Sequence, residues 1–143
     1  MTADTLRLDI VSAEKQIFSG EAEMVFLNGE MGELGIAPGH SQLLTTLRPG
    51  LVRAILPSKK EELFYISGGM IEVQPYIVSV LADTALRATD IDEAAALAAK
   101  EQAENVLAGK TSAIDIAKAT VELAEAVAQI RTIQQLKKKT RID

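Results

Sequence analysis

The sequence changes character near residue 88, and this change constrains the fold more than any other feature. Before it, apolar and polar residues alternate in short runs that glycine, proline and charged residues separate. After it, thirteen alanines and no proline lie between residues 94 and 128. A period of two is typical of strands with one buried face, whereas alanine favours helices because it loses no side-chain entropy there. We therefore expect a β domain over residues 1–86 and a helical domain over residues 87–143.

Short apolar runs in the first domain predict several strands. The expected strands cover residues 6–10, 21–28, 51–56, 63–67, 70–73 and 76–81. Turn residues separate them, including Pro57, the Gly68-Gly69 pair and Pro75, which cannot donate a hydrogen bond inside a ladder. Many short strands at regular spacing predict an antiparallel β-sandwich.

Residues 28–50 are the most unusual segment of this domain. They contain five of the nine glycines, two of the four prolines and the only histidine of the chain. Glycine permits positive φ angles and close backbone approach, and Pro-Gly dipeptides suit tight turns. We expect a shaped loop here, and we expect Leu43, Leu44 and Leu47 to be buried.

The sequence of the second domain predicts an antiparallel hairpin of two helices. Thr89 or Asp90 can cap the first helix, with Asp92 and Glu93 near its positive end. The second helix follows a break at residues 109–112.

A cap signal and an apolar stripe define the second helix. Ser112 stands three residues before Asp115, which is typical of a helix N-terminus. The stripe comprises Ile116, Thr120, Leu123, Val127, Ile130 and Ile133. Because the hairpin is small and rich in alanine, it must dock on something. Two alternatives stay open: permanent docking on the sandwich, or shallow contacts that exchange for a second partner.

The charge of the chain is unevenly distributed. The formal net charge is −5, yet the side chains of residues 131–143 alone sum to +4. Such a basic end is either a solvated terminus or an arm that pairs with an acidic surface. Nucleic acid is a poorer partner, because the chain is acidic as a whole and the basic end has no aromatic residue for stacking.

The candidate catalytic and ligand-binding residues do not match complete motifs. Gly109-Lys110-Thr111 resembles the end of a phosphate-binding loop, but Glu104 stands where that motif needs a glycine. His40 has no cysteine or second histidine with which to bind a metal, so we expect a turn or partner-contact role for it. We therefore expect no catalytic residues, no metal and no cofactor. A start without a leader pattern, and no apolar run of about 18 residues, predict a cytoplasmic protein.

Several long blocks resemble one known family. GELGIAPGHSQLL, TTLRPG, SGGMIEVQP and VSVLADTALR occur in an order and at spacings that closely resemble the epsilon subunit of bacterial F-type ATP synthase. The resemblance extends over essentially the whole chain. It implies a β-sandwich followed by a helical hairpin, in a non-catalytic subunit of the rotating central stalk that couples proton flow to ATP synthesis on the cytoplasmic side of the inner membrane.

The resemblance also implies partners for particular residues. Glu33 and His40 would contact the c-ring, in a loop that Gly32, Gly35 and Pro38 shape, and the sandwich would sit against the gamma subunit. When the hairpin extends into the catalytic head, its basic residues would meet the alpha and beta subunits and inhibit ATP hydrolysis. These basic residues are Arg131, Lys137, Lys138 and Lys139.

The sequence departs from the family at one position. Members that bind ATP carry an arginine where this chain has Ala95, within Ile91-Asp92-Glu93-Ala94-Ala95-Ala96. A triphosphate needs guanidinium or ammonium partners. We therefore expect weak or absent ATP binding, which disfavours the alternative function, a nucleotide-sensing module whose hairpin closes on ATP.

Overall fold

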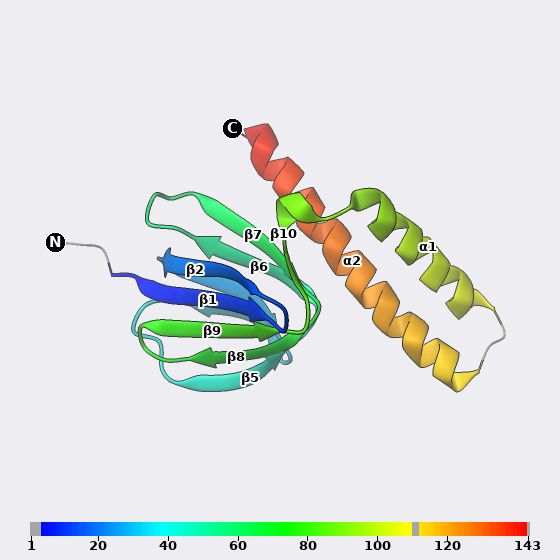
Figure 1. Ribbon diagram of the computed structural model, residues 1–143, viewed down its shortest axis with the longest axis horizontal. Helices are drawn as coiled ribbons and strands as arrows, with labels where there is room; N and C mark the ends of the chain where they lie inside the picture. The colour runs from blue at the N-terminus through cyan, green and yellow to red at the C-terminus, as the bar shows by residue number, and fades with distance from the viewer. Residues whose placement is uncertain (1–3, 110–111, 143) are drawn as a thin grey trace. The chain divides into compact units, whose positions relative to one another are not determined.

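A computed structural model describes residues 4–109 and 112–142, with the side chains of the last helix described as far as Lys138. The chain falls into two compact units that divide between Arg87 and Ala88 (Figure 1). The first unit is all-β, and the second is helical. The fold class expected from the sequence, a β-sandwich followed by two helices, is therefore confirmed.

Ten strands make up the first unit. They are β1 Leu6–Ser12, β2 Gln16–Ala22, β3 Met24–Gly29, β4 Gly32–Ile36, β5 Leu43–Leu47, β6 Gly50–Ile55, β7 Glu61–Ile66, β8 Gly69–Val73, β9 Ile77–Ala82 and β10 Ala85–Arg87. The strand order is β10-β7-β6-β3-β5-β8-β9-β1-β2, and β4 pairs with β3. Strands β3 and β5 meet through the single pair Gly29 and Leu47, so this contact joins two halves of five strands each.

Almost all strand pairs are antiparallel. The exception within the described chain is the parallel pair β1 and β9, so the sheet is not purely antiparallel as expected. Figure 1 shows β1, β9, β8 and β5 side by side in this order.

Inward-facing side chains of both halves form one hydrophobic core. Within β1 the buried residues alternate with outward-facing ones, as a period of two requires. The core comprises Leu6, Leu8, Ile10, Ala22, Val25, Leu27, Ile36, Leu47, Val52, Ala54, Phe64, Ile66, Ile71, Val73, Val78, Val80, Ala82 and Ala85. The first unit thus has a core of its own.

The expected strand over residues 21–28 is confirmed for residues 24–28, but its start is wrong, because residues 21 and 22 belong to a separate strand. β2 ends at Ala22 and β3 begins at Met24, and Gly20 lies inside β2, where it pairs with Leu8. A Cβ atom on Gly20 would lie 3.2 Å from the ring of Phe18. This glycine therefore admits a neighbouring ring within a strand and does not mark a turn. The short strand β10 was not expected at all.

The glycine-rich segment is not mainly loop, because it contains β4 and β5. Gly35 lies inside β4, where a Cβ atom would be 3.3 Å from the side chains of Met24 and Phe26. The expected burial holds for Leu47 but not for Leu44, which is 65% exposed. Successive strand residues face opposite sides, so Leu43 and Leu44 cannot both enter the core.

The second unit consists of a short 3-10 helix, Ala88–Asp90, and the helices α1, Glu93–Ala108, and α2, Ala113–Ile142. Asp92 caps α1, and its carboxylate accepts a hydrogen bond of 3.0 Å from the amide of Ala95. The expected caps Thr89 and Asp90 are wrong, because both lie in the 3-10 helix.

Ser112 caps α2 as expected, with its hydroxyl 3.2 Å from the amide of Asp115. Helix α2 extends to Ile142, so Arg141 belongs to it together with Arg131.

Helices α1 and α2 pack against each other. Buried small residues recur every seven positions, at Ala96 and Ala103 in α1 and at Ala119 and Ala126 in α2, followed by Ile133. A seven-residue interval is typical of the seam between two packed helices. The expected stripe is wrong at its start, because Ile116 is 44% exposed. Alanine occupies most of the buried positions of the two helices, so a stripe of large apolar residues does not mark the seam.

Candidate partner-binding surfaces

The outer face of the half-sheet β5-β8-β9 carries exposed apolar side chains. Leu44, Met70 and Leu81, here called the outer apolar patch, are 65%, 42% and 58% exposed. Met70 pairs directly with Leu81, and Leu44 pairs with Glu72, two positions along β8 from Met70. The three side chains therefore share one face and lie within two positions of each other in the register.

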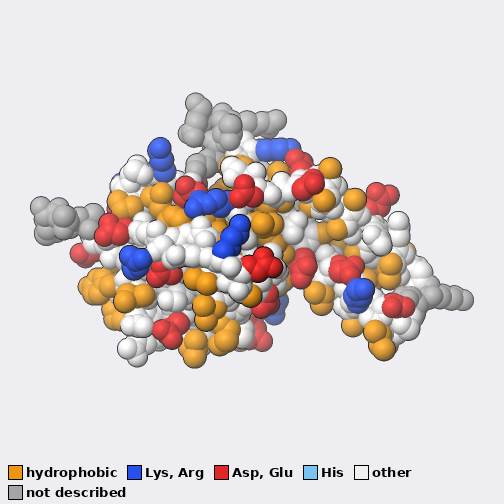
Figure 2. Space-filling view, in the orientation of Figure 1, with side chains coloured by type: hydrophobic (Ala, Val, Ile, Leu, Met, Phe, Trp, Pro, Cys, Tyr) orange, Lys and Arg blue, Asp and Glu red, His pale blue; other side chains and the backbone are white. Residues whose placement is uncertain are grey.

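Further exposed side chains extend the patch along β9. Ile77, the first residue of this strand, is 42% exposed, and Tyr76, which precedes it, is 57% exposed. On the face shown in Figure 2, hydrophobic side chains gather over the part of the sandwich where Figure 1 places β5 and β8. A cluster of large exposed apolar residues on a unit with its own core indicates an interaction surface.

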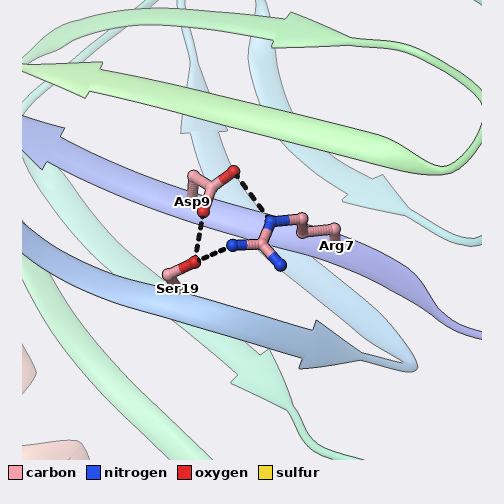
Figure 3. A network of polar contacts seen from close by, with 3 residues as sticks. All are labelled: Arg7, Asp9 and Ser19. Atoms are coloured by element: carbon pink, nitrogen blue, oxygen red, sulfur yellow. Dashed lines mark hydrogen bonds and ion pairs between the residues drawn. The ribbon is translucent and has the colours of Figure 1, made fainter.

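A polar network lies beside the patch on β1 and β2 (Figure 3). The hydroxyl of Ser19 donates to Asp9 at 2.6 Å and accepts from the guanidinium of Arg7, whose Nε lies 3.4 Å from the Asp9 carboxylate. Arg7 pairs in register with Ile77 of β9, so the network borders the apolar residues. An apolar centre with a polar rim is the usual arrangement of a protein interface.

The loop between β4 and β5 is fixed to the turn between β8 and β9. Gly39 has a φ of 86°, and its amide donates to the carbonyl oxygen of Pro75 at 2.6 Å. His40 follows, half-buried, with its amide 3.1 Å from the carbonyl oxygen of Ala37 and its Nδ1 2.7 Å from that of Ser41. The expected local role of His40 in a turn agrees with these contacts. Pro38 lies half-buried in the same loop.

Glu33 lies elsewhere, on the edge strand β4, where it pairs with Asn28 and is exposed. The hairpin between β3 and β4 places Met31 at its turn, 98% exposed, and Gly32 follows with a φ of 134°. Glu33 and His40 share no hydrogen bond or ion pair, so the structure does not bring these two described side chains together.

The expected basic residues of α2 differ in their surroundings. Lys137 forms an ion pair with Glu93, at 2.9 Å between Nζ and Oε2. Arg131 and Lys138 are exposed, whereas the side chain of Lys139 lies outside the described residues. The sequence pattern placed Glu93 only at the N-terminal end of α1 and did not indicate this pair. The available signal was the opposite charge at the two helix ends that an antiparallel hairpin brings together.

Helix α1 borders an open depression of about 410 Å³. It is lined by Ala98, Glu101, Gln102, Asn105 and Val106, which share one face of the helix. This lining offers a carboxylate and no cation, so it is unsuited to a phosphate group.

The described residues offer neither a cluster of metal ligands nor a membrane-spanning helix. No group of three or more histidine, cysteine, aspartate or glutamate residues is placed to hold a metal ion. No helix among these residues is both long and apolar enough to cross a membrane.

Comparison with known proteins places the chain in a family. Residues 5–88 match the model of the ATP synthase delta/epsilon chain β-sandwich domain, and residues 89–134 match that of the long α-helix domain. An ATP synthase epsilon chain from Nitrosococcus oceani is 56% identical over 137 residues, which are 96% of this chain and 98% of that relative. The chain belongs to the family of ATP synthase epsilon chains. The resemblance noted in the sequence is thereby confirmed.

Other similar proteins agree with this family. An ATP synthase epsilon chain from Legionella pneumophila is 58% identical, over 94% of this epsilon chain and 96% of that relative. A chain in the Euglena gracilis mitochondrial ATP synthase, OSCP/F1/c-ring, is similar in fold, with a TM-score of 0.79 and 21% identity over 87% of this chain and 78% of that one. A chain in the Tetrahymena thermophila mitochondrial ATP synthase, central stalk/c-ring, has a TM-score of 0.60 and 12% identity over 95% and 98%.

Proposed function

We propose that this epsilon chain is a non-catalytic central-stalk subunit of a proton-translocating F-type ATP synthase. In this role it couples proton flow to ATP synthesis, and its helices inhibit ATP hydrolysis. Residues 1–86 form the anchor and residues 87–143 the regulatory part. The complex places the chain at the cytoplasmic side of the bacterial inner membrane. The outer apolar patch supports this proposal most directly, because a unit that already has a core exposes a second apolar surface.

The outer apolar patch is the surface that we assign to the gamma subunit. A Tetrahymena thermophila chain of similar fold belongs to a structure of the central stalk and c-ring, so a stalk partner suits this surface. Burying a large apolar side chain contributes about 1.5–3 kcal/mol relative to leaving it exposed. Leu44 and Leu81 are more than half exposed, so they retain most of this contribution for a partner.

We assign the contact with the c-ring to the hairpin between β3 and β4 and to the loop that follows. Glu33 is exposed on β4, and His40 is held in the loop by its bonds to Ala37 and Ser41. The nearly full exposure of Met31 at the hairpin turn adds an apolar contact that the sequence did not suggest.

The regulatory part acts through the basic residues of α2. We propose that Arg131, Lys137, Lys138 and Lys139 meet acidic segments of the alpha and beta subunits when the hairpin extends. Individual exposed ion pairs contribute about 0.2–1 kcal/mol each. The summed free energy of a few such pairs is similar to the modest stability of a hairpin whose seam is largely alanine. The closed and the extended hairpin can therefore exchange.

The nucleotide-sensing alternative has less support. Asp92 already accepts the amide hydrogen of Ala95, and Ala95 offers no cation to a phosphate group. We therefore propose that the isolated chain binds ATP weakly or not at all.

Binding to an ATP synthase depleted of its epsilon subunit tests the role of the patch. Leu81→Asp places a charge within the outer apolar patch and is expected to weaken binding about tenfold or more. Ser58→Asp, in the exposed turn between β6 and β7, is the matched control and should change the affinity less than about twofold. Equal affinities for the two variants would exclude the patch as the anchoring surface.

A further inference from the structure

The two ends of the helical hairpin are closed differently. At one end the chain itself links α1 to α2, through residues 109–112. At the other end, Glu93 in the first turn of α1 meets Lys137 near the end of α2, with Nζ 3.0 Å from Oε1 and 2.9 Å from Oε2. The residues are 44 positions apart, so this ion pair is a tertiary contact between the helices.

Each member of the pair also suits its own helix. An acidic side chain is favourable at the positive N-terminal end of α1, and a basic one is favourable towards the negative C-terminal end of α2. An antiparallel arrangement brings these two ends together, so the charges that suit each helix also attract one another. The side chains of Lys137 and Glu93 are 62% and 43% exposed, which keeps the pair accessible and sensitive to salt.

Lys137 is also one of the residues that we propose to contact the catalytic head. Its neighbour Lys138 is exposed and makes no ion pair with any described side chain. The ammonium of Lys137 already lies within hydrogen-bond distance of both oxygens of Glu93, so fewer of its three donors remain for an acidic partner. Glu93 therefore occupies the place that a partner carboxylate would take.

We propose that the pair Glu93 and Lys137 is an ionic latch at the open end of the hairpin. An acidic segment of the catalytic head must displace Glu93 from Lys137 before the extended hairpin can inhibit hydrolysis. This inference rests on the proposed function for the identity of the competitor, but the latch itself is a property of the isolated chain.

Distance measurements on the isolated chain test the latch. The chain contains no cysteine, so spin labels can be placed at single cysteines that replace the exposed residues Ala99 in α1 and Gln134 in α2. Glu93→Gln and Lys137→Gln should each raise the ratio of open to closed hairpins about 1.4- to 5-fold at low salt. The double variant should add little more, and 0.5 M salt should remove most of the difference.

Two neighbouring substitutions serve as matched controls for this measurement. Glu104→Gln and Lys138→Gln change the same net charge on the same helices, at exposed residues without a described ion pair, and should leave the ratio unchanged. The exchanged pair Glu93→Lys with Lys137→Glu should return the ratio towards that of the unmodified chain. If Glu93→Gln behaves as Glu104→Gln does, or if the single effects simply add, the latch is wrong.

Inhibition of hydrolysis separates the latch from the proposed function. Glu93→Gln releases Lys137 and should lower the concentration for half-inhibition of an epsilon-depleted ATP synthase, whereas Lys137→Gln should raise it. If the distances change as expected but even the unmodified chain fails to inhibit, the latch stands and the proposed function fails. If the unmodified chain inhibits but Glu93→Gln matches Glu104→Gln in both measurements, the latch fails and the proposed function stands.

Discussion

Gly69 of β8 lies so close to β9 that a Cβ atom added to it would be 2.1 Å from the carbonyl oxygen of Leu81. Its φ of 147° is also one that other residues rarely adopt. Gly69 pairs with Ala82, so this close approach lies next to the pair of Met70 with Leu81, on which the outer apolar patch depends.

Gly69→Ala is therefore expected to lower the free energy of unfolding by about 3 kcal/mol or more, because backbone overlap adds to backbone strain. Gly32→Ala is the matched control. Gly32 has a φ of 134°, but nothing lies within 4 Å of its Cβ position, so only the strain of about 1 kcal/mol or more remains. Urea unfolding of both variants measures the difference, and equal losses would show that the overlap relaxes without cost.

Arg87 should stabilise the end of the sandwich through contacts that suit a planar guanidinium. Its Cζ lies 5.9 Å and 5.5 Å from the ring centroids of Phe18 and Phe64, and its Nη2 donates to the carbonyl oxygen of Ile17 at 3.1 Å. Arg87→Ala should lower the free energy of unfolding by about 1–3 kcal/mol. Arg87→Lys should recover less than half of this loss, because an ammonium neither stacks nor offers the same donors. Full recovery with lysine in thermal or urea unfolding would mean that charge alone matters.

Asp92 is expected to govern the start of α1. Asp92→Ala removes the hydrogen bond to the amide of Ala95 and should cost about 1 kcal/mol of helix stability, seen as faster hydrogen exchange in the first turn of α1. Asp90→Ala carries the same charge change outside the cap and should leave this exchange within about twofold. Similar acceleration in both variants would point to a general charge effect.

We expect Ala95 to determine how the isolated chain responds to ATP. Titration calorimetry of the unmodified chain should give no micromolar signal, because a triphosphate lacks a guanidinium partner at the start of α1. Ala95→Arg should gain a measurable signal if the rest of the hairpin is competent, with Ala95→Gln as a control of similar length without charge. A micromolar signal from the unmodified chain would overturn the expectation.

Much of the fold could be predicted because local patterns and tertiary structure agree there. Alternation in residues 6–10 marks a strand with one buried face, and the Ser112 cap depends on neighbours three residues away. The failures occur where distant contacts decide. Glycine is typical of turns, but Gly20 lies inside β2, where the ring of Phe18 packs against it. Leu44 is apolar, yet its position in β5 places its side chain on the outer face of the sheet.

The candidate surfaces were less predictable than the fold. Glu33 and His40 were chosen through a family resemblance, and their partners remain proposals. The outer apolar patch was missed, because Leu44, Met70 and Leu81 come together only through the register of three strands. The pair of Glu93 with Lys137 was missed for a similar reason, since its members are 44 residues apart.

ATP hydrolysis by a cognate ATP synthase depleted of its epsilon subunit tests the central claim most directly. The full chain and a chain ending at Ala88 would be titrated into this complex, with circular dichroism to verify that the shorter chain is folded. The account predicts that both chains bind and that only the full chain inhibits hydrolysis. Binding of both without inhibition by either, or equal inhibition by both, would contradict it.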